Sequence, residues 1–368
     1  MNILITGSEG FIAKNLITNL KDKKKYNILE ITKKTKEKEF EKKINISNLI
    51  FHLAGVNRPN GKTTFRDNYN LTKKIARILS KSKKKTPIIF SSTTQTLSKN
   101  KYGNSKLKSE KILINLKNKN KNKICIFKIP NVFGKWSKPN YNSVVATFCV
   151  NLLNNKKSIV NKSDLISLVH IDDLIKDFLP YIEKKTWKNN YGKINHVFKI
   201  KVGNLFEIIK KFHEDEKINF IPNFENDFQK KLFSVYVSYK KIGQIKSRST
   251  KCFENRSGKF VEFLKHNNFG QISYLKCKPN QIRGMHFHHK KVENFIIVQG
   301  KAEFTYKSLL NNVTKKFYSS EKDNKIIQTL PGWAHKIKNI GKVDLILLIW
   351  SNEVFDRNKP DTFKYLNI

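Results

Sequence analysis

The spacing of short apolar runs changes part-way along the chain and divides it into two parts of different fold class. Up to about residue 240, runs of strand length alternate with helical stretches. That alternation predicts an α/β domain with a parallel sheet built from right-handed strand–helix–strand crossovers. The expected strands are Asn2–Thr6, Ile28–Ile31, Leu49–Ala54, Pro87–Ser91 and Ile124–Ile129.

From about residue 250 onward, strand-like runs follow one another without helices between them. They recur about every 8–12 residues with turn residues in between, which is typical of an all-β barrel or jelly roll. The polar segment Lys240–Lys251 separates the two patterns, so we expect one domain at residues 1–245 and another at 246–368. The expected strands of the second domain are Phe260–Leu264, Gly270–Lys276, Asn294–Val298, Ala302–Tyr306, Lys325–Leu330 and Leu345–Trp350.

The net charge of +44 invites a nucleic-acid interpretation that the residue types do not support. Only seven of the 73 basic residues are arginine, and the lysines are scattered over the whole length. Base readout favours arginine and aromatic residues gathered in one block. We therefore expect no nucleic-acid partner, although a basic surface attracts small anionic substrates over long range.

Cysteine usage and the chain start indicate a cytoplasmic protein without a membrane partner. No CxxC pair is present, which fits a reducing compartment. Met1 leads directly into an apolar strand without a signal-peptide pattern, and Leu345–Trp350 is too short to span a bilayer. The four cysteines are Cys125, Cys149, Cys252 and Cys277.

A glycine-containing turn, Thr6-Gly7-Ser8-Glu9-Gly10-Phe11-Ile12-Ala13, joins the first expected strand to a helical stretch. Glycines in such a turn let backbone N–H groups approach a pyrophosphate, and the start of the helix adds partial positive charge. This position favours a Rossmann-type dinucleotide site over a degenerate turn. The expected cofactor-binding residues here are Gly7, Gly10, Phe11 and Ile12.

The end of the second expected strand indicates which nicotinamide cofactor binds. NAD-preferring sites usually place a carboxylate there against the adenosine ribose. Strand parity puts Thr32 at this position, and Lys33 and Lys34 follow it with charges that suit a 2′-phosphate. Glu30 is the alternative carboxylate, but the alternation of side chains along the strand directs it away from this position. We therefore expect NADPH.

Tyr102 and Lys106 stand at the head of a helical run, at a spacing that places both on one helix face. A nearby ammonium lowers a tyrosine pKa, so that the phenol can act as an acid near neutral pH. The alternative is a chance Tyr–Lys pair on the surface. The position beyond the apolar run that ends in Ser91-Ser92-Thr93 favours the catalytic interpretation.

The strongest signal in the second part is Gly284-Met285-His286-Phe287-His288, followed by Glu293 and, downstream, by Pro331-Gly332-Trp333-Ala334-His335. His-x-His on a strand points both imidazoles to one face. Glu293 and His335 complete a three-histidine, one-carboxylate site suited to zinc or another divalent first-row metal. His289 is a spare imidazole that could replace His288 or move protons.

The first part resembles the extended short-chain dehydrogenase/reductase family. The resemblance implies Thr93, Tyr102 and Lys106 as the catalytic set, with Thr93 where many relatives have serine. Asp172 is left open between a site role and a plain helix N-cap. Three further segments carry the resemblance: Phe51–Pro59 looks like the loop after the fourth strand, Pro130–Trp136 running on to Ser143 looks like the substrate segment, and His170–Asp173 follows it. Implied cofactor contacts are Leu53, Ala54, Gly55 and Lys106, and implied UDP-sugar contacts are Asn131 and Lys138.

The second part resembles a cupin, and together the two parts look like the bifunctional capsular-polysaccharide enzymes of the UDP-N-acetyl-L-fucosamine pathway. The runs Asn255–Phe260 and Trp350–Asp356 extend this resemblance over nearly the whole chain. Two departures concern loop geometry: Pro331-Gly332 replaces Pro-x-Gly, and Lys325 stands where a glycine is expected. Metal-free cupins exist and are the main alternative to the metal site.

By that resemblance, the cupin inverts C3 of a UDP-2-acetamido-2,6-dideoxy-hexos-4-ulose. The reductase part then transfers hydride from NADPH to C4, giving a UDP-N-acetyl-6-deoxy-L-talosamine, and the protein is expected to be a homodimer. His289, Lys290 and Tyr306 are the candidates for the epimerisation base. Two rivals remain: a dTDP-4-dehydrorhamnose-type epimerase/reductase with a metal-free cupin, and a cofactor-sensing binding protein without catalysis.

Overall fold

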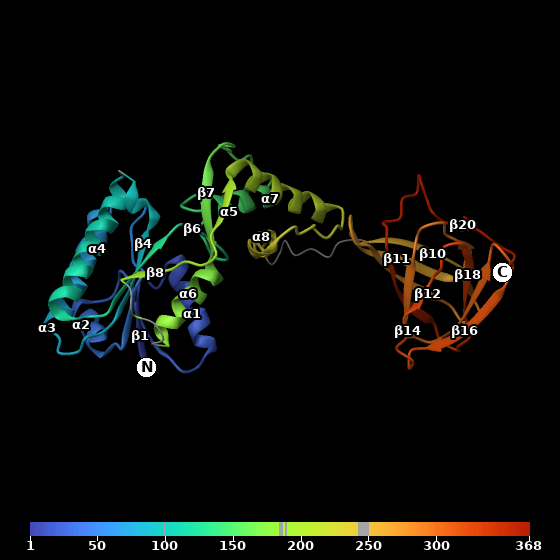
Figure 1. Cartoon of the computed structure of the whole chain (residues 1–368), viewed down its shortest axis with the longest axis horizontal. Coiled ribbons are helices and arrows are strands. Elements are labelled where there is room, and N and C mark those ends of the chain that lie inside the picture. The colour runs from blue at the N-terminus through green and yellow to red at the C-terminus, as the bar shows by residue number, and fades with distance from the viewer. Residues whose placement is uncertain (99, 184–186, 188–189, 242–249) are drawn as a thin grey trace. The chain divides into compact units, whose positions relative to one another are not determined.

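The computed structural model describes residues 1–98, 100–183, 187, 190–241 and 250–368. These residues form two compact units. The N-terminal unit holds Met1–Lys210 and Asn226–Lys241, and the C-terminal unit holds Lys211–Glu225 together with the C-terminal part of the chain. Figure 1 shows an α/β arrangement in the first and strands in the second. The expected domain boundary at 245/246 lies outside the described residues and stays a prediction.

A six-stranded, all-parallel sheet forms the centre of the N-terminal unit, in the order β2-β1-β3-β4-β5-β8. Strand order reverses between β1 and β3, which opens a crevice at their carboxyl ends, the usual ligand position in such sheets. The strands are β1 (Asn2–Thr6), β2 (Asn27–Ile31), β3 (Leu49–His52), β4 (Ile88–Thr93), β5 (Ile124–Ile129) and β8 (Tyr191–Gly192).

Helices cover both faces of this sheet (Figure 1). α1 (Phe11–Asp22) and α6 (Ile171–Ile182) pack on one face, where the buried α1 side chains Ala13, Leu16 and Leu20 recur at helical spacing. The opposite face carries α2 (Glu37–Ile46), α3 (Arg66–Lys81) and α4 (Lys101–Asn120). A 3₁₀ turn, η1 (Thr94–Leu97), joins β4 to α4.

A smaller sheet, β6-β7-β9, completes the N-terminal unit. β6 pairs with β7 in parallel and β9 pairs with β7 antiparallel. Its strands are β6 (Asn131–Phe133), β7 (Leu165–His170) and β9 (Phe198–Lys201), and the accompanying helices are α5 (Val144–Leu153), α7 (Val202–Lys217) and α8 (Asp227–Ser238). The end of α7 groups with the C-terminal unit, where the Ile221 N–H donates to the Lys265 carbonyl at 2.7 Å.

Two antiparallel sheets form the C-terminal unit, in the orders β10-β11-β12-β19-β14-β17 and β16-β15-β18-β13-β20. Alternate side chains from both, including Phe295, Phe304 and Leu347, fill the core. The strands are β10 (Lys251–Asn255), β11 (Gly258–His266), β12 (Gly270–Cys277), β13 (Ile282–Phe287), β14 (Glu293–Gln299), β15 (Lys301–Ser308), β16 (Thr314–Ser320), β17 (Ile327–Gln328), β18 (Trp333–Asn339), β19 (Leu345–Ser351) and β20 (Phe363–Lys364).

The fold class expected from sequence is confirmed: a Rossmann-type parallel-sheet domain precedes an all-β domain. Some strand details differ. The segment Phe51–Pro59 leads out of β3, the third strand of the chain and not the fourth. The expected strand Lys325–Leu330 shrinks to the two residues of β17. All four cysteines are free, and none of the described helices has both the length and the apolar character needed to cross a bilayer.

Candidate functional site

The glycine turn after β1 forms a cradle at the start of α1. Gly7 has φ +68°, and a Cβ there would lie 2.7 Å from the Cα of Ala54. Only glycine therefore fits between β1 and the loop after β3. Gly10 is the N-cap of α1, and no side chain caps this helix end, which leaves Phe11 and Ile12 at an N-terminus open to an anion. The residues present fit a dinucleotide pyrophosphate.

The turn after β2 presents the two lysines expected there. Ile31 ends the strand, and its carbonyl accepts the Gly7 N–H at 2.9 Å, which joins this turn to the glycine cradle. The Thr32 hydroxyl accepts the Lys34 N–H at 3.1 Å, and Lys33 and Lys34 are exposed. Two exposed cations therefore closely follow the end of β2.

The loop after β3 contacts both the glycine cradle and Lys106. The Ala54 N–H donates to the Thr6 hydroxyl at 3.2 Å, and a Cβ on Gly55 would lie 3.0 Å from the Nζ of Lys106. Asn68 of α3 fixes the loop, because its amide group accepts the Val56 N–H at 2.6 Å and donates to the Val56 carbonyl at 3.0 Å. Asn68 was not predicted as a site residue from the sequence. The only feature that could have indicated it is its position as an asparagine early in a helical run.

Thr93, Tyr102 and Lys106 come from neighbouring elements at the carboxyl end of the sheet. Thr93 ends β4, and its hydroxyl accepts the Gln95 N–H at 3.2 Å. Tyr102 and Lys106 occupy successive turns of α4, whose start packs against η1 so tightly that a Cβ on Gly103 would overlap the Gln95 carbonyl. Lys106 is 3% exposed, and its ammonium donates to the Ser91 carbonyl at 2.8 Å.

The expectation that Lys106 lowers the pKa of Tyr102 is wrong for this structure. Burial raises the pKa of Tyr102 to about 12, and the neighbouring Tyr141 adds to the increase. The Lys106 ammonium is instead directed at Ser91. Burial also lowers the pKa of Lys106 to about 8, against the opposing charge of Glu110. Tyr102 is therefore a protonated phenol near neutral pH, which suits a proton donor.

A cavity of about 510 Å³ lies in the N-terminal unit between the loop after β3, the small sheet and the start of α5. Asn131, the expected UDP-sugar contact, lines it and donates to the Ser167 carbonyl at 3.3 Å. Lys138 lies at its edge, with its ammonium 5.4 Å from the ring centroid of Tyr141, a lining residue. Arg58 is the one charged lining residue, which sequence reasoning missed although arginine is rare in this chain.

The start of α6 rules out one of the two interpretations left open for Asp172, that of a helix N-cap. The N-cap is His170, whose ring nitrogen accepts the Asp172 N–H at 3.4 Å. Asp172 lies in the first turn and forms an ion pair of 3.1 Å with Lys135. It is therefore not the cap, and it holds the segment after β6 against α6.

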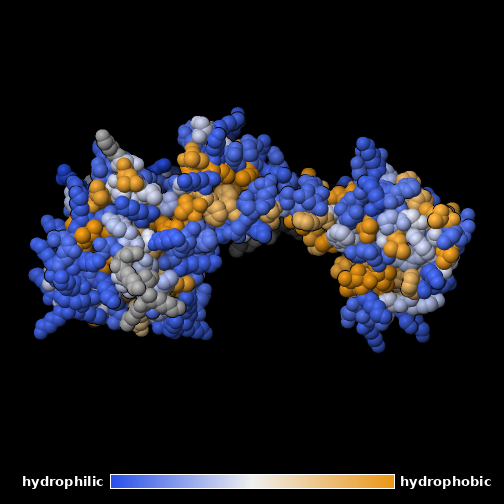
Figure 2. Space-filling model, in the orientation of Figure 1, coloured by the Kyte–Doolittle hydropathy of each residue, from blue (hydrophilic) through white to orange (hydrophobic). Residues whose placement is uncertain are grey.

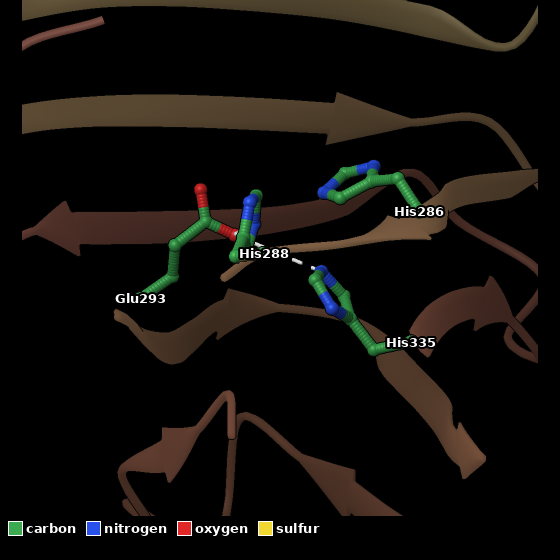
Figure 3. A group of neighbouring side chains, drawn as sticks. All are labelled: His286, His288, Glu293 and His335. Carbon is green, nitrogen blue, oxygen red and sulfur yellow. Dashed lines mark ion pairs between the residues drawn. The ribbon is translucent and has the colours of Figure 1, made fainter. Parts of the chain in front are cut away.

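Four side chains converge in the C-terminal unit: His286, His288, Glu293 and His335 (Figure 3). Their ligand atoms all lie within 4.8 Å of one another. His286 on β13 pairs in register with His335 on β18, and His288 follows the end of β13. Glu293 begins β14, and its Oε2 lies 3.4 Å from His288 Nε2.

The electrostatics of this cluster suit a cation. Burial lowers the pKa of His286 to about 4 and that of His335 to about 3, so these imidazoles are neutral at physiological pH. Burial alone would raise the pKa of Glu293, but the adjacent His288 imidazole and the Lys291 ammonium hold it well below its ordinary range. One ring nitrogen each of His286, His288 and His335 is buried without a hydrogen-bond partner. Buried imidazole nitrogens without hydrogen-bond partners, close to a carboxylate, fit a divalent metal ion.

Of the three base candidates, only Tyr306 lies beside the cluster. Its ring centroid is 6.2 Å from that of His335, and its hydroxyl is buried without a partner. His289 is exposed and packs against Phe363 outside the cluster, and Lys290 forms an exposed ion pair with Glu353. His288, and not His289, therefore belongs to the cluster.

A cavity of about 300 Å³ reaches the cluster from the side of β10. Arg283 lines it together with His286, because a β-bulge between Gly284 and His286 shifts the alternation of side chains. The sequence Pro331-Gly332, where the family pattern has Pro-x-Gly, still forms a turn that contacts the histidine cluster. Gly332 has φ +77°, and its N–H donates to the His288 carbonyl at 2.9 Å.

Comparison with known proteins identifies the family. Residues 3–196 match the NAD dependent epimerase/dehydratase family, and residues 253–363 match the polysaccharide biosynthesis C-terminal domain. The chain belongs to the NAD-dependent epimerase/dehydratase family. A nicotinamide cofactor is implied by that membership. The resemblance of the sequence to nucleotide-sugar enzymes with a capsular-polysaccharide role is confirmed by these matches and by the relatives that follow.

Relatives of full length share both units. A UDP-2-acetamido-2,6-beta-L-arabino-hexul-4-ose reductase from Pseudomonas aeruginosa is 33% identical over 99% of this chain and 98% of its own. The capsular polysaccharide assembling protein CapF from Staphylococcus aureus is 34% identical, with a TM-score of 0.90 over 99% of this chain and 100% of its own. UDP-glucose 4-epimerase from Thermotoga maritima shares the fold over 65% of this chain, at 18% identity and a TM-score of 0.53.

Proposed function

We propose that this protein is a bifunctional UDP-sugar enzyme that inverts C3 of UDP-2-acetamido-2,6-dideoxy-hexos-4-ulose and then reduces the C4 ketone. The product is UDP-N-acetyl-6-deoxy-L-talosamine, a precursor for surface polysaccharide. Full-length similarity to a UDP-4-keto-sugar reductase supports the substrate class. The observation that carries the two-step proposal is the three-histidine, one-carboxylate cluster in a unit separate from Tyr102 and Lys106.

Epimerisation is assigned to the C-terminal unit, where His286, His288, Glu293 and His335 would hold the metal. A bound divalent metal, zinc in our proposal, supplies Lewis acidity toward the C4 ketone, which acidifies the C3–H bond. The chain contributes neutral imidazoles and an ionised carboxylate held close together by β13, β14 and β18. A base removes the C3 proton from one face of the sugar, and Tyr306, with its pKa raised by burial, is the proposed acid that delivers a proton to the opposite face.

Reduction is assigned to the N-terminal unit, where NADPH supplies the hydride. Tyr102 gives its phenolic proton to the oxygen on C4 as that oxygen becomes an alkoxide. Lys106, charged below pH 8, stabilises negative charge beside the phenol, and Thr93 at the end of β4 orients the ketone oxygen. Lys33 and Lys34 are proposed to contact the 2′-phosphate that distinguishes NADPH from NADH.

The 510 Å³ cavity is the proposed UDP-sugar site. Its lining combines one cation, Arg58, with neutral polar groups such as Asn131 and with apolar side chains, which suits an anionic ligand that carries a sugar. Lys138 at the edge is proposed to add a second positive charge. We also propose a cytoplasmic location, which this substrate class and the four free cysteines support.

We further propose a homodimer formed through the outer face of the C-terminal unit. Figure 2 shows hydrophobic residues gathered on this unit around β14. Val298, Leu348 and Trp350 on the neighbouring strands β14 and β19 are 53%, 42% and 37% exposed. Exposed apolar side chains in one patch favour burial against a second copy. Sedimentation equilibrium measures the mass of the protein in solution, which should be that of two chains.

One experiment separates the proposed function from its rivals. The enzyme is incubated with NADPH and the 4-keto sugar linked to either UDP or dTDP, and the products are identified by NMR. We expect UDP-N-acetyl-6-deoxy-L-talosamine from the UDP sugar and far slower turnover of the dTDP sugar. Preferred turnover of the dTDP sugar would replace the proposal with the rhamnose-type activity. Cofactor binding without turnover of either would leave a cofactor-sensing protein.

A further inference from the structure

A carboxylate near the chain end fastens the loop that follows the second histidine of the cluster. Asp361 accepts hydrogen bonds from three consecutive backbone N–H groups, those of His289 at 3.0 Å, Lys290 at 2.8 Å and Lys291 at 2.7 Å. Consecutive N–H groups that converge in this way form an anion-binding nest. Burial would raise the pKa of Asp361, but these backbone hydrogen bonds hold it below its ordinary value. The carboxylate is therefore ionised and its bonds are charge-assisted.

The backbone around Asp361 runs beside the strand that carries the metal-ligand candidates. β20 pairs with the end of β13, with Lys364 opposite His286 and Phe363 opposite Phe287. The Tyr365 N–H donates to the Met285 carbonyl at 2.8 Å. The rings of Phe363 and Phe287 stack with centroids 5.3 Å apart. The segment is thus attached on both sides of His286 and His288.

The same segment contacts His288 itself. The backbone carbonyl of Asp361 lies within hydrogen-bond distance of His288 Nδ1, and the ring is 1% exposed. A carbonyl only accepts, so Nδ1 carries a proton, and in the neutral tautomer of this ring the lone pair is on Nε2. Nε2 is the atom that faces Glu293 and has no hydrogen-bond partner. The contact therefore selects the tautomer that a metal ion requires.

We infer that Asp361 is a positioning residue for the metal centre: its carboxylate clamps residues 289–291, and its carbonyl fixes the ring and tautomer of His288. This inference rests on the proposed metal site. Partners of this kind orient metal-binding histidines and raise their basicity, and their loss typically weakens metal affinity about 10- to 100-fold. If the Asp361 carboxylate only anchored the chain end, its removal would change the stability of the protein but not the orientation or tautomer of the His288 ring.

The test uses full-length protein, Zn²⁺ and a chromophoric chelator as competitor. Asp361→Ala removes the clamp, whereas Asp361→Asn keeps the shape and one acceptor oxygen. Asp356→Ala is the matched control, because this carboxylate in the same segment accepts the Asn358 N–H, a local turn contact at 2.9 Å. We expect zinc affinity to fall about 10- to 100-fold in Asp361→Ala, by less in Asp361→Asn, and to stay unchanged in the control.

A second measurement does not depend on metal. In the metal-free protein, the ¹⁵N shifts of His288 report which ring nitrogen is protonated. Wild type and Asp356→Ala should show Nδ1–H. Asp361→Ala should show a mixture of tautomers, because without the carboxylate clamp the segment no longer holds its backbone carbonyl against Nδ1. If Asp361→Ala fails to fold by circular dichroism, Asp361→Asn carries the comparison. Wild-type zinc affinity and an unchanged tautomer in the folded Asp361 variants would overturn the inference. Absence of zinc binding by wild type would instead overturn the metal site, and the tautomer measurement would still decide the role of Asp361.

Discussion

The ammonium of Lys106 donates a 2.8 Å hydrogen bond to the backbone carbonyl of Ser91, two residues before Thr93. Burial in this position lowers the pKa of Lys106 to about 8. The lysine is charged below that pH and loses its charge as the pH rises through it. We therefore expect kcat/KM for ketone reduction to fall above about pH 8. The measurement is a pH profile of NADPH oxidation with a 4-keto sugar already inverted at C3. A flat profile through pH 8 to 9 would contradict the assignment of Lys106.

Removal of the Tyr102 hydroxyl should abolish most of the reduction. Tyr102→Phe keeps the ring but removes the proton donor, so the reduction rate should fall by about 10²-fold or more. NADPH affinity should change little, because the cradle at Gly7 and Gly10 is built from other residues. Tyr69→Phe on α3 is the matched control and should keep the wild-type rate. A near-normal rate in Tyr102→Phe would remove this residue from its role.

NADPH should bind more tightly than NADH because two exposed lysines, Lys33 and Lys34, follow Thr32 where an acid would favour NADH. Replacement of both lysines by alanine should weaken NADPH binding and leave NADH binding nearly unchanged. Lys24 and Lys25, an exposed pair before β2, provide a control with the same change in charge. The measurement is a fluorescence titration with each cofactor. Comparable affinities of wild type for NADPH and NADH would defeat the prediction.

Features set by local spacing could be predicted from the sequence. The Gly7–Gly10 turn, the Tyr102–Lys106 pair and the His286-x-His288 motif all depend on residues a few positions apart. Strand and helix periodicity convert such spacing into a shared face or a shared turn. Glu293 and His335 were assigned to the cluster from the order of ligand types along the sequence. β14, which carries Glu293, was expected within one residue at each end, whereas β18, which carries His335, had no expected counterpart.

Features set by packing between distant segments were beyond that reasoning. The pKa of Tyr102 depends on burial, which reverses the effect expected from a lysine one turn away. Arg283 reaches the cavity only because a β-bulge breaks the alternation of its strand. Asp361 meets His289 through a contact between residues 72 positions apart, and no motif marks it. The assignment of Thr93, Tyr102, Lys106 and the proposed metal ligands to their roles stays a prediction.

The two chemistries should separate by unit. Replacement of both His286 and His288 by alanine removes two of the four proposed ligands, so the protein should lose its metal. Epimerisation at C3 should stop, while the cofactor site in the N-terminal unit, built from other residues, should survive. A metal can also support the fold, so circular dichroism must accompany the assay.

Deuterated water makes this separation measurable. Without NADPH, wild type should exchange deuterium into C3 of the UDP-4-keto sugar, and the double variant should not. The variant should nevertheless bind NADPH and reduce a 4-keto sugar already inverted at C3 at close to the wild-type rate. His289→Ala, which changes an exposed imidazole outside the cluster, is the matched control and should exchange C3 normally. Normal C3 exchange by the folded, metal-free double variant would show that the cluster does not hold a catalytic metal, because the chemistry would then proceed without two of its ligands.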